Sequence, residues 1–169
     1  MPAWLRLVIF ALFAALAIAL AAVGQRLLAA PPGVLALLML AAWFRYHDIR
    51  RAESAYNARN RTEAWRLLEG IPFDGRLLAR ECRIYYHNLR ARCLLADEEW
   101  ARAAAEAERA IGAGTSKDQT PGCHVVAAEA YVHVGDTEAA RRHADAAKAL
   151  PHSEFVDRGL ARLAHLLAK

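Results

Sequence analysis

The sequence predicts an all-α protein in which an N-terminal transmembrane helical hairpin precedes a short α-solenoid of helix pairs and a C-terminal capping helix. Three observations lead to this prediction. Residues 7–23 form an unbroken apolar run, all 18 acidic residues lie from Asp48 onward, and the apolar residues after Ile49 follow helical spacing without strand-like alternation. The expected organisation is a two-helix anchor over 1–46, about three helix pairs over 47–151 and a capping helix over 152–169.

The first apolar segment is long enough to cross a bilayer. A helix from Trp4 to Val23, rising about 1.5 Å per residue, extends roughly 30 Å, which matches the hydrocarbon thickness. A cleaved signal peptide is the alternative, because Arg6, the apolar stretch and the small residues near Ala22 fit its outline. A second apolar stretch that follows directly favours the anchor.

The second apolar segment is interrupted by Pro31-Pro32-Gly33. Because proline fits the first turn of a helix, we expect this helix to start near Pro32, after a loop that begins at Gly24. Residues 33–44 alone rise only about 18 Å. Spanning then requires continuation beyond Tyr46, tilt or local thinning of the bilayer, and a re-entrant hairpin is the alternative.

Charged residues orient the expected hairpin. Arg26 is the cation of the loop, whereas five arginines follow the second segment: Arg45, Arg50, Arg51, Arg59 and Arg61. The positive-inside rule then places both termini in the cytoplasm. Three cysteines without a CxxC pair agree with a reducing compartment. We therefore expect a multi-pass protein of a bacterial-type inner membrane, with its helix pairs in the cytoplasm.

Glycine, proline and asparagine divide the remainder into helices expected at 48–58, 61–69, 76–95, 98–111, 122–134, 136–149 and 153–168. The last of these carries Val156, Leu160, Leu163 and Leu167 on one face, and Ser153 is placed to cap its start. One apolar and one polar face suit a helix that closes a solenoid. A helix lying on the membrane surface is the alternative.

The third helix pair resembles the tetratricopeptide repeat (TPR) family. It has small residues at the helix contact, an aromatic residue, a Gly-Asp turn and a closing proline: Ala128, Tyr131, Gly135-Asp136, Ala139, Ala146 and Pro151. The second pair shows weaker matches at Ala91, Leu94, Trp100, Ala103, Ala107 and Ala110, and the first at Tyr56, Asn60, Ala64, Leu68 and Pro72. Two membrane helices before TPRs also resemble the HemY-type proteins in element order. A plain antiparallel helical bundle is the alternative.

The TPR resemblance implies a concave surface lined by the first helix of each pair. Carried over position by position, it would present Arg50, Ser54, Asn57, Tyr85, Asn88, Arg92, Val125, Glu129 and His133. Arg50 and Arg92 would suit an acidic peptide, and Tyr85 would supply an anchor. The alternative is that these are ordinary solvated helix residues. The groove residues we predict are therefore Arg50, Asn57, Tyr85, Asn88, Arg92, Glu129 and His133.

Motifs for chemistry are absent from the sequence: there is no HExxH zinc motif, phosphate-binding loop or nucleophile elbow. The net charge of +4 is too small for nucleic-acid binding by bulk charge. We therefore expect no enzyme, no cofactor and no metal. The predicted function is a membrane-tethered adaptor or assembly factor that binds a protein partner. The alternative is a structural subunit of a larger membrane complex, held through its hairpin by small residues at Ala11, Ala15 and Ala19.

Overall fold

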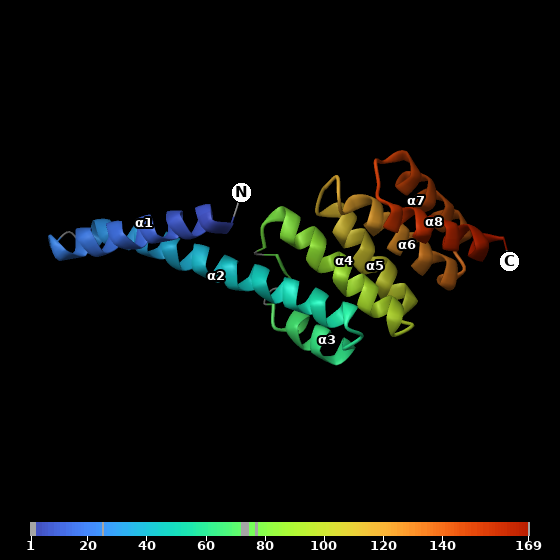
Figure 1. The fold of residues 1–169 in the computed structure, drawn as a ribbon, viewed down its shortest axis with the longest axis horizontal. Coiled ribbons are helices and arrows are strands. Elements are labelled where there is room, and N and C mark those ends of the chain that lie inside the picture. Colours follow the sequence, from blue (N-terminus) through green and yellow to red (C-terminus); the bar gives the residue numbers. More distant parts are fainter. Residues whose placement is uncertain (1–2, 25, 72–74, 77, 169) are drawn as a thin grey trace. The chain divides into compact units, whose positions relative to one another are not determined.

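The computed structural model describes residues 3–24, 26–71, 75–76 and 78–168, with only the backbone described for 3–10, 26–29, 35 and 37–46. Every regular element in these ranges is a helix, so the all-α class is confirmed (Figure 1). The chain divides into two compact units, Met1–His47 and Asp48–Lys169. The division falls within a single long helix.

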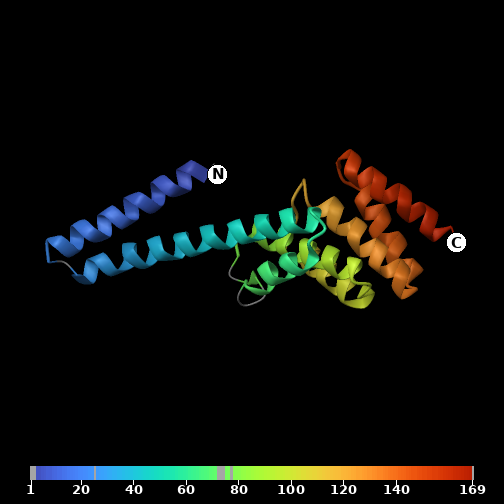
Figure 2. The same cartoon turned by 60° about the horizontal axis from the view of Figure 1, so that its bottom comes forward.

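The first unit holds α1 (Ala3–Ala22) and the start of α2 (Arg26–Asn57), which run in opposite directions on either side of a short turn (Figure 2). Gly24 takes the left-handed conformation in this turn, with φ +78°. The two helices approach closely where a Cβ added to Gly33 would lie 3.8 Å from the Ala17 Cβ. The predicted small-residue row is not in this contact, because Ala11, Ala15 and Ala19 are exposed.

Two expectations about α2 are wrong. The helix starts at Arg26 and contains Pro31 and Pro32, rather than starting near Pro32. Because the prolines lie in the second turn, they remove only two helical hydrogen bonds, those to the carbonyls of residues 27 and 28. The helix also continues to Asn57 instead of ending before a separate helix at 48–58. Residues 45–48 contain neither glycine nor proline, so nothing breaks the helix there.

Within the part of the chain that the structure describes, no helix has both the length and the apolar character needed to cross a membrane. The transmembrane hairpin and the membrane location stay predictions from the sequence.

The second unit contains the end of α2, then α3 (Arg61–Glu69), α4 (Arg80–Ala96), α5 (Trp100–Gly112), α6 (Thr120–Val134), α7 (Thr137–Ala149) and α8 (Glu154–Leu167). From α3 to α8, each helix packs against the next one in the chain, α4 also packs against α6, and α6 against α8. Alternate helices therefore share one face of the stack, which is the packing of an α-solenoid.

The turns after α2, α4 and α6 have the same conformation. Each contains a left-handed residue, which is Arg59 (φ 61°), Glu98 (φ 62°) or Gly135 (φ 89°). The next amide donates to the carbonyl five residues earlier, the bond of a Schellman motif. These bonds are Asn60 N to Ala55 O at 2.9 Å, Glu99 N to Leu94 O at 2.9 Å, and Asp136 N to Tyr131 O at 3.0 Å. The three helix pairs thus share a turn that the sequence shows only at Gly135.

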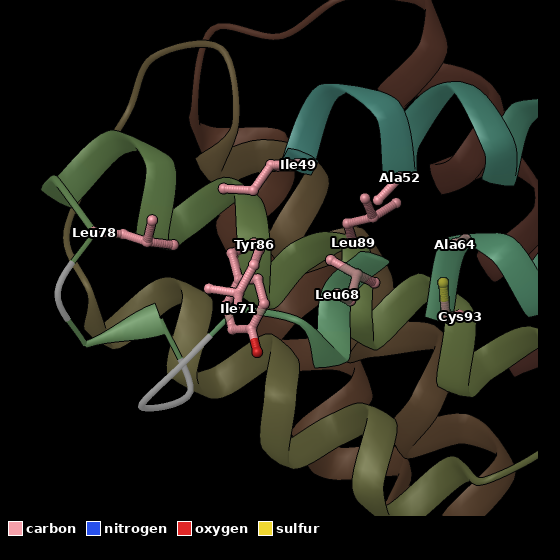
Figure 3. Packing of buried hydrophobic residues seen from close by; sticks show 9 residues of the cluster. All are labelled: Ile49, Ala52, Ala64, Leu68, Ile71, Leu78, Tyr86, Leu89 and Cys93. Carbon is pink, nitrogen blue, oxygen red and sulfur yellow. The ribbon is translucent and has the colours of Figure 1, made fainter. Parts of the chain in front are cut away.

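The core is assembled from apolar side chains that neighbouring helices contribute in turn. Figure 3 shows the cluster between α2, α3 and α4, where Ile49, Leu68 and Leu89 are at most 2% exposed. Alanine fills the tightest helix contacts, and the positions predicted for it are buried: Ala64, Ala91, Ala103, Ala107, Ala110, Ala128 and Ala139. Small side chains let antiparallel helices pack at short range. The predicted contact residue Ala146 is only half-buried.

Helix α8 packs against α6 and α7. A Cβ added to Gly159 would lie 2.7 Å from Val125 Cγ1, so the absence of a side chain allows α8 to approach α6. The expected cap at Ser153 is wrong, because its side chain makes no capping hydrogen bond. Its carbonyl instead accepts from the amides of Val156 and Asp157, and the Asp157 carboxylate is bonded to His152 at 2.9 Å.

Candidate functional site: a hollow lined by alternate helices

The second unit contains a hollow of about 780 Å³. Its lining residues all come from α2, α4, α6, α8 and the segments just before α6 and α8. They are Glu53, Tyr56, Asn57, Tyr85, Asn88, Arg92, Leu95, Ala96, Asp118, Gln119, Gly122, Val125, Val126, Glu129, Ser153, Phe155, Val156, Arg158, Gly159 and Arg162. Because alternate helices share one face of the stack, residues far apart in the sequence meet there.

The structure brings five of the seven predicted groove residues to this hollow, namely Asn57, Tyr85, Asn88, Arg92 and Glu129. Arg50 and His133 are exposed and lie outside its lining. The His133 ring stacks on Trp100, with centroids 4.0 Å apart and planes 13° apart. His133 is therefore part of the contact between α5 and α6. That the five lining residues bind a partner stays a prediction.

The wall formed by α2 and α4 is held by aromatic contacts. The Tyr85 hydroxyl is hydrogen-bonded to Glu53, and burial, this bond and the Glu53 charge raise the pKa of Tyr85. The Arg92 guanidinium lies 4.6 Å from the centre of the Tyr56 ring. The Tyr56 hydroxyl donates to the backbone carbonyl of Arg92 at 3.4 Å. These contacts fix the orientation of Tyr85 and Arg92 at the edge of the hollow.

Among the described residues that line the hollow, Asn88 is the one with a buried side-chain polar atom that has no hydrogen-bond partner. It is 8% exposed, and its Oδ1 has no hydrogen-bond partner. A buried amide oxygen without a donor costs about 1–3 kcal/mol. A bound group with an N–H or O–H donor would recover this energy. Asn88 is therefore the position where a bound chain gains most from a single hydrogen bond.

The sequence predicted the α6 residues Val125 and Glu129 of the next wall but not the contribution of α8, which was expected to be a cap or a helix on the membrane surface. Arg162 of α8 forms an ion pair with Glu129 of α6. Phe155 lines the hollow with 62% of its surface exposed, and Arg158 lies beside it in the lining. The spacing of residues 155, 158 and 162 places them on one helix face. This spacing is the signal in the sequence that could have identified α8 as part of the lining.

Opposite charges balance in the lining. Glu53, Asp118 and Glu129 face Arg92, Arg158 and Arg162 in the same hollow. A net-neutral surface with apolar Val125, Val126 and Phe155 selects by shape and hydrogen bonding more than by bulk charge. This balance agrees poorly with an acidic peptide chosen through Arg50 and Arg92 alone.

Groups that bind metals are not gathered in the described part of the chain, where no three His, Cys, Asp or Glu residues are placed to hold an ion. Cys123 and His124 diverge: Cys123 is buried against Ile84 and Ala110, while His124 reaches α7. Burial raises the pKa of Cys93 to about 11 and that of Cys123 to about 12. Both thiols are free and lie in the core.

In each of two successive helix pairs, a polar pair of side chains joins the two helices; the first polar pair is buried and the second is half-buried. His87 Nδ1 lies 2.7 Å from Glu106 Oε2, between α4 and α5. His124 Nδ1 lies 3.0 Å from His143 Nδ1, between α6 and α7. The two residues of each pair are 19 positions apart in the sequence. The second pair follows the first by 37 positions, from His87 to His124 and from Glu106 to His143. The same position of the stack thus carries a polar pair twice.

Comparisons with protein-family models, curated proteins and solved structures found no match to this chain.

Proposed function

We propose that this protein is a protein-interaction adaptor or assembly factor that holds a segment of a partner protein in the hollow, close to a membrane. The observation that carries the proposal is the hollow itself, which four alternate helices line with apolar, aromatic and hydrogen-bonding groups. Ligand sites are commonly concave and largely apolar, with a few placed polar groups. Membership of the TPR family stays part of this proposal.

The chemistry of the lining supports a peptide or helix as the occupant. Tyr85 and Phe155 offer amphipathic and apolar anchors, and Asn88 offers a buried amide that can pair with a backbone group. Arg92 adds a donor held in place by Tyr56. Such a set binds an extended or helical segment along the hollow more readily than a small charged metabolite.

Attachment to a membrane is supported by the sequence of residues 7–23 and by exposure in the first unit. Leu12, Leu16, Ile18 and Val34 are between 48% and 70% exposed. Apolar side chains exposed in a group are typical of a surface that lipid or another protein covers. A tether would confine adaptor and partner to one surface, so weak contacts in the hollow would suffice.

Site-specific photo-crosslinking in native membranes tests the hollow. A photoreactive phenylalanine analogue replaces Tyr85 or Phe155 in two separate full-length variants, and Arg141, exposed on α7, is the matched outer-face control. We expect both lining positions to cross-link the same protein, with Asn88→Ala weakening the product and the control position giving none. Equal cross-linking from Arg141, or products unaffected by Asn88→Ala and Arg92→Glu, would refute the proposal.

A structural subunit of a membrane complex is the second candidate. It is favoured by one observation, namely that Ala11, Ala15 and Ala19 are exposed and free to pack against a further helix. Replacing residues 1–46 with an unrelated hairpin separates the two candidates. Retained partner binding supports the adaptor, whereas lost assembly with intact binding of a soluble partner segment supports the subunit.

A further inference from the structure

A chain of polar groups links three helices away from the hollow. The Glu108 carboxylate of α5 lies 2.9 Å from His143 Nε2 of α7, and His143 Nδ1 lies 3.0 Å from His124 Nδ1 of α6. The Tyr131 hydroxyl donates to the same Glu108 oxygen at 3.2 Å, and its ring stacks on His143 with centroids 5.5 Å apart. His143 therefore lies between a partner on α5 and a partner on α6.

The geometry fixes where the protons lie when both histidines are neutral. An ionised carboxylate only accepts hydrogen bonds, so His143 must donate to Glu108 through Nε2–H. The Nδ1 atom of neutral His143 is then an acceptor, and His124 must donate to it through Nδ1–H. The chain runs from His124 through His143 to Glu108, with one proton in each bond.

Adding protons has different effects at the first and second step. One added proton leaves a single hydrogen between the two Nδ1 atoms, so the bond between the rings survives. With both rings protonated, each Nδ1 carries a hydrogen, the bond is lost, and two positive charges face each other across 3.0 Å. Glu108 can offset only one of these charges.

We propose that the Glu108–His143–His124 chain is an acid-sensitive latch, which holds α7 against α5 and α6 and releases it when both imidazoles are protonated. The proposal is independent of what the hollow binds. Because α7 packs against α8, and α8 forms one wall of the hollow, release also loosens that wall. The partner-binding face and the pH of the compartment are thereby coupled.

Burial and the surrounding charges move the protonation of His124 to lower pH. Burial and the positive charge of His143 lower the pKa of His124, although Glu108 opposes them. On the neighbouring Tyr131, the charge of Asp136 raises the pKa of the hydroxyl and that of Arg142 lowers it. A lowered pKa in the folded state means that the stabilising contribution is complete above the unfolded value of 6.5 and is lost as the pH falls below it.

The equivalent pair in the preceding helices provides an internal control. His87 faces the Glu106 carboxylate rather than a second imidazole, at 2.7 Å. A proton added to His87 creates an ion pair, so the contact between α4 and α5 tightens where that between α6 and α7 weakens. The contact between α4 and α5 should therefore not weaken over the pH range in which the contact between α6 and α7 does.

Hydrogen exchange of the full-length chain, resolved by peptide between pH 7.5 and 4.5 and corrected for intrinsic rates, tests the latch. We expect protection factors in α7 and α8 to fall about tenfold below pH 6, while those in α4 hold. His124→Asn places a non-titrating amide donor near the position of Nδ1 and should abolish the fall. His165→Asn, at an exposed residue of α8, is the matched control and should leave it unchanged.

Nuclear magnetic resonance of the wild-type histidine rings gives a second measurement that needs no variant. Coupled two-step titration of His124 and His143, with loss of the shared proton signal at the second step, supports the latch. Independent single-step titration of both rings overturns it. So does an equal loss of α7 protection in wild type and His124→Asn.

Discussion

Glu106 makes the most demanding prediction, because it is a carboxylate that is only 5% exposed between α4 and α5. Its two oxygens are occupied by His87 at 2.7 Å and by Arg109 at 2.8 Å, and Arg90 lies 3.7 Å away. Burial acts to raise the pKa of Glu106, but the His87 bond and the charges of Arg90 and Arg109 outweigh it, so the pKa is lowered. The folded state therefore depends on the ionised form.

The substitution Glu106→Gln keeps the shape and removes the charge. Each charge-assisted hydrogen bond that becomes neutral loses about 1 kcal/mol, so the two bonds together predict a loss of about 2 kcal/mol. Glu106→Ala leaves the buried His87 without its acceptor and should cost about 3–5 kcal/mol. Glu138→Gln is the matched control, because Glu138 pairs with Arg142 on the surface with an 85% exposed side chain. An exposed pair contributes only about 0.3–0.5 kcal/mol.

Urea unfolding of the full-length chain, followed by helical circular dichroism, measures these differences. The stabilisation from a lowered carboxyl pKa is complete above the unfolded value of 4.5 and fades as the pH falls below it. The difference in unfolding free energy between wild type and Glu106→Gln should therefore narrow as the pH falls from 4.5 to about 3. A loss no larger than that of Glu138→Gln, or a gap independent of pH, would refute the role assigned to the buried charge.

Three further predictions concern packing. Arg59→Gly and Glu98→Gly should each stabilise the fold by about 1 kcal/mol in urea unfolding, because both residues hold a left-handed conformation. A destabilising result for both would contradict the shared turn geometry. Gly159→Ala should destabilise by about 1–3 kcal/mol despite the higher helix propensity of alanine, because its Cβ would clash with Val125. The loss should shrink in a Val125→Ala background, and additivity in that double-mutant cycle would disprove the contact. Cys123, with its pKa near 12, should resist iodoacetamide at pH 8 until the protein is unfolded, as mass spectrometry can show.

Local patterns in the sequence predicted most of the fold. Helical spacing and breakers located α3, α5 and α7 to within about two residues at each end, because those helices are bounded by Asn60, Gly112, Asp136 and Pro151. The start of α2 was missed because a proline pair was taken for a boundary, although the helix tolerates it in its second turn. The left-handed Arg59 and Glu98 carry no residue signal for that conformation.

The candidate site was predictable along each helix but not between helices. Helical phase brought Tyr85, Asn88 and Arg92 to one face, and these line the hollow together. The contribution of Phe155 depends on how α8 stacks against α6, and the bond between His124 and His143 depends on the relative rotation of α6 and α7. A single sequence gives the period of a helix but not its register against a neighbour.

The order of helix contacts also bears on how the second unit forms. From α3 to α8, helices pack against those one or two places away in the chain, so the segments that meet are separated by one loop or by one helix and its two loops. Closing short loops costs little entropy, and domains of this kind fold quickly. Folding of such a stack can begin at any helix pair and propagate to the neighbouring pairs. α8, which follows the other helices of this stack in chain order, would complete both the core and the hollow.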